Sequence, residues 1–285
     1  MNQKLWTTLV LAALVVSAIL LPFAEMKKSS APDSIAKALF FPSKYPIGDW
    51  TPDGLMFKDV HFYSADGTKL HGWYCPAKEP RGVMLFAHGN AGNVASRARL
   101  LRHLQTQTNV SVFIFDYRGF GRSEGTPSID GALQDAQAAR EKLRQLASIT
   151  DSKMLLMGES LGGAIVVQLA AENGAHASIL QSTFSSLQDL AKVHYPQFAS
   201  LVSPDTLDSA SSIKKYKGPV YLSHGEDDKT IPLRIGKRLF QAANEPKQFN
   251  AIPNADHNNW MTSEYLEELD SFINNVVAVN EAEEL

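Results

Sequence analysis

Cysteine is nearly absent from this sequence, since Cys75 is the only one in 285 residues. A disulfide within the chain is therefore impossible, and a metal cluster held by several thiolates is excluded. Cys75 directly follows Trp73 and Tyr74. We interpret it as a packed core residue rather than as a nucleophile.

An excess of positive charge is also lacking. The formal net charge is −3, and no block of Lys and Arg occurs in the chain. Nucleic acid is therefore not an expected partner. Internal repeats and low-complexity stretches are absent as well, while 44% of the residues are hydrophobic and 20% are charged. This composition is typical of a globular protein with one sizeable core.

Charged residues are missing altogether between Lys4 and Glu25. As a helix, the apolar residues 5–24 would extend about 30 Å, which is the hydrocarbon thickness of a bilayer. The stretch is longer than the apolar region of a typical signal peptide, and Pro22-Phe23-Ala24 is a poor cleavage site. We therefore predict an uncleaved single-pass membrane anchor, with a cleaved signal peptide as the alternative.

The lysines around this stretch bear on its orientation. Lys4 precedes it, whereas Lys27, Lys28, Lys37 and Lys44 follow it. This bias favours a protein body on the cytoplasmic side of the membrane. Cleavage of the segment would instead imply a secreted or periplasmic protein.

Beyond residue 55, short apolar runs alternate with helical patterns. The first two runs flank Asp66-Gly67, which is a signal for a β-hairpin. The later runs are continuous, as is typical of strands covered on both faces of a parallel sheet: GVMLFAHG, SVFIFDYRG, KMLLMGES, ASILQST, PVYLSHG and QFNAIPNA. Helical patterns lie between them, over residues 95–106, 129–148, 161–173 and 232–243. This order predicts an α/β fold with a doubly wound, mostly parallel sheet, right-handed crossovers and an N-terminal β-hairpin.

The same patterns divide the chain into parts. We expect an N-terminal tail and membrane anchor over residues 1–28, followed by a linker over 29–54. One α/β domain should occupy residues 55–279, and the acidic residues 280–285 should form a solvated tail.

The stretch LLMGESLGGA, at residues 155–164, places Ser160 between Gly158 and Gly162. It joins a predicted strand to a predicted helix, which is the context of a nucleophile elbow. There the serine sits at a sharp bend, and the glycines let the strand and the helix approach closely. The helix N-terminus favours negative charge that develops beside the serine.

A serine hydroxyl needs a base to take its proton, and the base needs an acid to orient it. In this architecture the acid and then the histidine follow the serine along the chain. Glu226, Asp227 and Asp228 end one predicted strand, and His257 follows the last one. Because the carboxyl ends of parallel strands meet at one crevice, we predict a catalytic triad of Ser160, one of these carboxylates and His257.

Several stretches together resemble the α/β-hydrolase superfamily: AHGNAGN, DYRGFGRSEG, GESLGG, HGEDD and ADHNN. The chain is most similar to its membrane-anchored α/β-hydrolase-domain serine hydrolases, a group that includes protein depalmitoylases. The resemblance covers roughly residues 38–275 and implies an α/β-hydrolase fold. It implies Ser160 as the nucleophile, Asp228 as the acid and His257 as the base. Asp256 stands where members of the family commonly have glycine.

In an enzyme of this kind, two backbone amides hold the oxyanion that forms during the reaction. We expect these to be the amides of Asn90 and Leu161, with Ala91 as the alternative to Asn90. His88 and His224 are expected to be structural. Asp116, Tyr117 and Arg118 are expected to brace the turn after their strand. The acids at 226–228 are not expected to bind calcium, because the remaining ligands of such a site are not evident. The triad mechanism requires no metal or cofactor.

Residues 184–216 fall where such folds carry a cap over the pocket. This cap is short, which suggests an open cleft for an acyl substrate. We therefore expect a serine esterase or thioesterase that acts on a small acyl ester, a thioester or an acylated substrate, at a membrane reached through residues 5–24. A peptidase or amidase uses the same chemistry, and a non-catalytic binding protein is a third hypothesis. The complete triad argues against the binding protein, which has no need of an activated serine.

Overall fold

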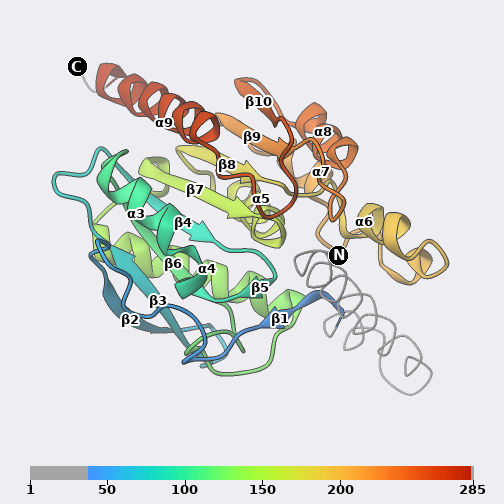
Figure 1. Ribbon diagram of the computed structural model, residues 1–285, viewed down its shortest axis with the longest axis horizontal. Coiled ribbons are helices and arrows are strands. Elements are labelled where there is room, and N and C mark those ends of the chain that lie inside the picture. Colours follow the sequence, from blue (N-terminus) through green and yellow to red (C-terminus); the bar gives the residue numbers. More distant parts are fainter. Residues whose placement is uncertain (1–37, 284–285) are drawn as a thin grey trace, which may run out of the picture.

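The computed structural model of the protein describes residues 38–283. An eight-stranded sheet runs through the molecule, and helices cover both of its faces (Figure 1). Across the sheet the strands follow the order β10-β9-β8-β7-β4-β6-β3-β2. Their bounds are β2 (Lys58–Tyr63), β3 (Lys69–Cys75), β4 (Gly82–Ala87), β6 (Val110–Asp116), β7 (Met154–Glu159), β8 (Ala177–Gln181), β9 (Val220–Gly225) and β10 (Lys247–Ile252).

Strand direction confirms the predicted fold class. The pairs β2–β3 and β3–β6 are antiparallel, and β2 and β3 form the expected hairpin around Asp66-Gly67. Every other pair in the sheet is parallel. All residues of β6, β8 and β9 are buried, as expected for continuous apolar strands covered on both faces. The carboxyl ends of the parallel strands therefore meet at one edge.

Two apolar clusters lie on the two faces of the sheet. One contains the buried residues of α4 (Ile129–Ala147), α5 (Leu161–Asn173) and α8 (Leu233–Ala242). The other contains those of α3 (Ala98–Thr106) and α9 (Ser263–Glu283). A 3₁₀ turn, η1 (Val94–Arg97), leads into α3, so the helix begins later than the predicted residue 95. A second such turn, η2 (Asp151–Lys153), precedes β7.

The expected cap segment, residues 184–216, folds into short elements between β8 and β9. They are α6 (Leu187–His194), η3 (Ala199–Leu201) and α7 (Ser209–Ile213). The hydroxyl of Ser186 caps α6 by accepting a hydrogen bond from the amide of Asp189 at 3.0 Å. Most of the buried apolar residues of this segment, such as Phe184, Leu187 and Ile213, belong to the cluster on the α4 and α5 face. Figure 1 shows α6 extending beyond the strands, at the end to which β7 points.

Part of the expected linker packs on the α/β fold. The short strand β1 (Phe41–Pro42) pairs in parallel with β5 (Ala91–Gly92). Phe40 is buried in the core, and the indole ring of Trp50 contacts that of Trp73 edge-on, with the ring centroids 5.6 Å apart. At the other end, α9 continues to Glu283, past the predicted domain limit at residue 279.

The predicted anchor, residues 5–24, lies outside the described residues. None of the helices between residues 38 and 283 combines the length and the apolar character needed to cross a membrane.

Candidate active site

Ser160 occupies a sharp turn between β7 and α5. Its backbone angles are φ 54° and ψ −117°, which a non-glycine residue rarely adopts. The turn is possible because its neighbours lack a Cβ atom: one added at Gly162 would lie 1.9 Å from the carbonyl oxygen of Ala87, and one at Gly158 would lie 2.3 Å from that of Gly162. The first turn of α5 thus packs directly on the ends of β4 and β7.

Hydrogen bonds from β8 and the segment after it hold the turn in place. The amide of Ser160 donates to the carbonyl oxygen of Gln181 at 2.8 Å. The hydroxyl of Thr183 donates to the carbonyl oxygen of Ser160 at 2.7 Å. Both backbone groups of Ser160 are therefore satisfied while its side chain stays available for other contacts.

The three side chains expected to form the triad are brought together. The Ser160 Oγ atom lies 3.0 Å from the Nε2 atom of His257. The Nδ1 atom of His257 lies 2.7 Å from the Oδ2 atom of Asp228. Ser160 is 7% exposed and the Asp228 side chain is fully buried, so this chain of hydrogen bonds leads from the edge of the site into the interior.

Asp228 is stabilised as an anion. Burial alone would raise the pKa of its carboxyl, but hydrogen bonds from His224 and His257 and from the amide of Ile231 outweigh this effect and lower the pKa to about 2. The Ile231 amide donates to Oδ1 at 2.8 Å. The Nε2 atom of His224 lies 3.4 Å from Oδ2 and donates to the carbonyl oxygen of Ile231 at 2.7 Å. His224 therefore supports the turn that carries Asp228.

The two other carboxylates of this turn face solvent. Glu226 and Asp227 are exposed. Their amides donate to the carbonyl oxygens of Ile252 and Ala255 at 3.1 and 2.9 Å, which ties the turn to the loop that carries His257. Only Asp228 among the three carboxylates lies at hydrogen-bond distance from His257 within the described part of the chain.

The loop of His257 is shaped by Asp256, the residue that departs from the family pattern. Its Oδ1 atom accepts hydrogen bonds from the amides of Asn258 and Asn259 at 2.7 and 3.0 Å. A short carboxylate that accepts from the amides two and three residues later closes a tight turn, and this turn contains the histidine.

The loop after β4 lies against Ser160 from the other side. A Cβ atom at Gly89 would stand 3.5 Å from the Cβ atom of Ser160. The Asn90 side chain donates to the carbonyl oxygen of Leu39 at 2.7 Å, and the amide of Phe41 donates to the Asn90 carbonyl at 2.8 Å. The backbone amides of Asn90 and Leu161 have no hydrogen-bond partner within residues 38–283, so both remain free to donate to a substrate.

Residues that were expected to be structural make buried contacts near this loop. His88 is buried, and its Nδ1 atom donates to the carbonyl oxygen of Gly89 at 2.7 Å. The Asp116 Oδ1 atom accepts from the amide of Val94 at 2.9 Å. Arg118 pairs with the buried carboxylate of Asp135 at 2.8 Å. The contacts of His88 and Asp116 hold the loop after β4, whereas the Arg118 pair holds the turn after β6 to α4.

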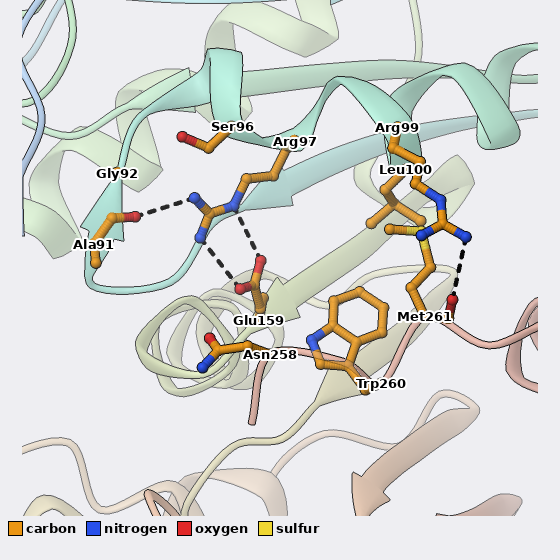
Figure 2. A pocket seen from close by; sticks show the side chains of 10 residues that line it. All are labelled: Ala91, Gly92, Ser96, Arg97, Arg99, Leu100, Glu159, Asn258, Trp260 and Met261. Carbon is orange, nitrogen blue, oxygen red and sulfur yellow. Dashed lines mark hydrogen bonds and ion pairs between the residues drawn. The ribbon is translucent and has the colours of Figure 1, made fainter. Parts of the chain in front are cut away.

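One ion pair beside the serine was not predicted. The Nε and Nη2 atoms of Arg97 donate to the two carboxylate oxygens of Glu159 at 3.1 and 3.2 Å, and Nη1 donates to the carbonyl oxygen of Ala91 at 3.0 Å. Arg97 thereby joins the end of β7 to the short strand β5 (Figure 2). The sequence signal was a single acid, Glu159, at the end of an otherwise apolar strand.

This ion pair lines a cleft of about 370 Å³, which we call the Arg99 cleft. Its walls come from the start of α3, with Arg99 and Leu100, and from the segment after His257, with Asn258, Trp260 and Met261 (Figure 2). A Cβ atom at Gly89 would lie 3.4 Å from Arg97 Nη2, 3.4 Å from Glu159 Oε1 and 3.5 Å from the Cβ atom of Ser160, so the cleft adjoins the hydrogen-bonded triad. No group of three or more His, Cys, Asp or Glu side chains in the described part of the chain is placed to hold a metal ion.

Comparison with known proteins agrees with this geometry. A family model described as serine aminopeptidase S33 matches residues 78–207. The protein YfhR of Escherichia coli strain K12 is 36% identical over 219 residues, which cover 72% of this chain and 75% of YfhR. The α/β-hydrolase-domain-containing protein WAV2 of Arabidopsis thaliana is 33% identical over 242 residues, which cover 76% of this chain and 78% of WAV2.

Among solved structures, an esterase of Pyrococcus furiosus superposes with a TM-score of 0.68 at 18% identity, covering 84% of this chain and 97% of the esterase. At this identity the likeness concerns the fold. Fold, motifs and sequence similarity all define an α/β hydrolase. The chain belongs to the α/β-hydrolase superfamily, in the group of α/β-hydrolase-domain proteins to which WAV2 is assigned by name.

The depressed pKa of Asp228 predicts how stability depends on pH. Because the carboxyl pKa falls from 3.8 to about 2 on folding, the ionised group stabilises the folded state above pH 3.8, and this contribution is lost as the pH falls through about 2. We expect the difference in unfolding free energy between wild type and Asp228→Asn to shrink by about 2 kcal/mol between about pH 5 and pH 2. Urea denaturation at a series of pH values measures it. Ser160→Ala keeps the carboxylate and should retain the wild-type pH dependence, whereas parallel curves for wild type and Asp228→Asn would contradict the prediction.

Proposed function

We propose that this protein is a serine hydrolase that cleaves carboxylic esters or thioesters through an acyl-enzyme, at a membrane surface. One observation carries the proposal: an unbroken chain of hydrogen bonds runs from the Ser160 hydroxyl through His257 to the buried, ionised carboxylate of Asp228. Each role below follows from the position of the group in that chain.

In the first half of the reaction, the Ser160 Oγ atom attacks the acyl carbonyl carbon while the Nε2 atom of His257 takes the hydroxyl proton. The π electrons of the carbonyl move to its oxygen, which becomes an oxyanion. When the carbonyl forms again, the bond to the leaving group breaks, and His257 returns the proton to the departing oxygen or sulfur. Ser160 is then esterified.

In the second half, water takes the place of the leaving group. His257 accepts a proton from the water as its oxygen attacks the acyl-enzyme, and it gives this proton to Ser160 Oγ as the acid product leaves. Asp228 accepts a hydrogen bond from the Nδ1–H group of His257. This keeps the ring in the tautomer whose Nε2 atom carries no proton. The negative charge of Asp228 also stabilises the imidazolium.

The backbone amides of Asn90 and Leu161 are the proposed donors to the oxyanion. Support comes from their place on the two sides of Ser160 and from the absence of hydrogen-bond partners for them within the described residues. Leu161 is the first residue of α5, so the partial positive charge of the helix end acts on the same oxygen. One such donor typically contributes a factor of about 10²–10³ in rate.

Two observations bear on the substrate. The short cap, residues 184–216, favours an acyl group that enters from an open side, as in an esterase. The matching family model, by contrast, bears the name of an aminopeptidase, which makes a peptidase or amidase the second candidate. Both reactions need the same triad, so a panel of acyl esters, acyl thioesters and aminoacyl anilides distinguishes them by kcat/KM.

The membrane surface enters the proposal through the N-terminal segment. Residues 5–24 carry no charge. Farther along, Leu39 and Phe41 are hydrogen-bonded to Asn90, the proposed oxyanion residue. The segment between residues 24 and 39 can extend over at most about 50 Å, so a membrane that held residues 5–24 would lie within that reach of the loop that carries Asn90.

Replacing the serine tests the nucleophile. We expect Ser160→Ala to lower kcat for a p-nitrophenyl ester by at least about 10⁴-fold, because no other group can form the acyl-enzyme. Labelling by a fluorophosphonate should be lost as well, since Ser160 Oγ would displace the fluoride. Near-normal turnover by Ser160→Ala with unchanged circular dichroism would contradict the assignment.

Two neighbouring carboxylates provide a matched test of the acid. Asp228→Asn keeps the shape of the side chain but favours the wrong tautomer of His257, and it should lower kcat by about 10⁴-fold. Asp227→Asn alters an exposed carboxylate and should change kcat by less than about threefold, because solvent screens its field. The kcat values are compared alongside thermal stability. If Asp227→Asn is inactive and Asp228→Asn stays active, the acid has been assigned to the wrong residue.

Fractionation tests the predicted anchor. The full chain, expressed in cells, should pellet with membranes and resist extraction by alkaline carbonate, because about 20 apolar residues span a bilayer. A variant with two Lys residues introduced within residues 5–24 should become extractable. Recovery of a soluble wild-type form whose sequence starts near residue 25 would instead support the cleaved signal peptide.

A further inference from the structure

We propose that the Arg99 cleft binds the leaving group of the substrate and selects one that carries a carboxylate. This inference rests on the proposed hydrolase function and names the substrate class for that site: esters or thioesters whose alcohol or thiol part is a monoanion.

The position of the cleft indicates which half of the substrate it receives. The leaving atom must lie close to His257 Nε2, which supplies its proton. The cleft wall begins at Asn258, the next residue, and continues with Trp260 and Met261. Leu100 and Trp260 belong to the apolar cluster on the α3 and α9 face, whereas the cap segment belongs to the opposite cluster. The leaving group therefore extends towards α3, and the acyl group lies on the cap side.

The positive and negative charges that line the cleft do not balance. Arg97 and Glu159 compensate each other through two hydrogen bonds, and a third from Arg97 is used by the Ala91 carbonyl. Arg99 has no acidic partner among the residues that the structure describes; its Nη2 atom makes a long contact of 3.5 Å with the carbonyl oxygen of Met261. The lining thus carries one uncompensated positive charge, on the exposed side chain of Arg99 beside Met261 (Figure 2).

The shape of this cation and its surroundings favour a carboxylate. A guanidinium presents two parallel N–H groups that match the two oxygens of a carboxylate. A single compensating cation suits a monoanion better than a dianionic phosphate. The walls formed by Leu100, Trp260 and Met261 are apolar enough to contact a ring or a short carbon chain between the ester and the charge.

A set of matched esters tests the inference on the full chain in detergent. The substrates are 4-nitro-3-(butanoyloxy)benzoic acid and its methyl ester, which share the acyl group and whose leaving groups differ by one charge and one methyl group. For wild type we expect kcat/KM to be about fivefold higher for the acid than for the methyl ester. The preference should disappear at about 1 M ionic strength, where the Debye length is about 3 Å.

Two variants of α3 assign the preference. Arg99→Gln should lower the acid-to-ester ratio of kcat/KM about fivefold. Arg102→Gln removes the same charge from an exposed residue of the same helix outside the cleft, and it should leave the ratio unchanged. Circular dichroism checks that both variants fold. Arg99→Lys keeps the positive charge but loses the two parallel N–H groups of the guanidinium, and it should give an intermediate acid-to-ester ratio.

A binding measurement separates this inference from the hydrolase proposal. Calorimetric titration of Ser160→Ala protein with 3-methoxy-4-nitrobenzoate should show binding that Arg99→Gln, added to Ser160→Ala, weakens about fivefold. Turnover of both esters without a preference for the acid, or with a preference that survives Arg99→Gln, would overturn the inference and leave the hydrolase proposal standing. No turnover of either ester, combined with Arg99-dependent binding, would overturn the hydrolase proposal and keep the carboxylate site. No binding of the benzoate would overturn the carboxylate site.

Discussion

The direct contact between the first turn of α5 and the ends of β4 and β7 is the constraint on which the rest of the site depends. At Gly162 there is no room for even one methyl group, because the carbonyl oxygen of Ala87 occupies its place. This contact forces the backbone of Ser160 into a conformation that costs on the order of 1–3 kcal/mol. Hydrogen bonds from Gln181 and Thr183 hold it there. The serine and the helix N-terminus consequently face the same small volume.

Electrostatics around the serine are arranged in compensated pairs. The buried carboxylate of Asp228 would be costly in isolation, but it accepts hydrogen bonds from His257 and Ile231 and lies beside His224. Glu159, one residue before the serine, is neutralised by Arg97 in a two-point ion pair. Both carboxylates beside the serine are therefore satisfied by groups close to them.

Much of this arrangement could be predicted, for a physical reason. The motif residues Ser160, Asp228 and His257 each follow a strand of a parallel sheet, and the carboxyl ends of such strands share one edge. The choice of Asp228 over Asp227 came from family resemblance, because local sequence does not show which side chain of a turn points inward. The Arg97–Glu159 pair was missed since an arginine on a helix and an acid beside a nucleophile each look like solvated residues in the sequence. The packing of Phe40 and Trp50 was missed because the Pro and Gly residues around them are typical of a linker.

The hydrogen bond between Ser160 and His257 joins residues 97 positions apart, and that between His257 and Asp228 joins residues 29 apart. Between them the chain must complete β8, the cap, β9 and β10 in register before these side chains can meet. A fragment that ends before residue 257 lacks the histidine. If the proposed function holds, the serine therefore lacks its base and acid during synthesis until the last strand has emerged and docked.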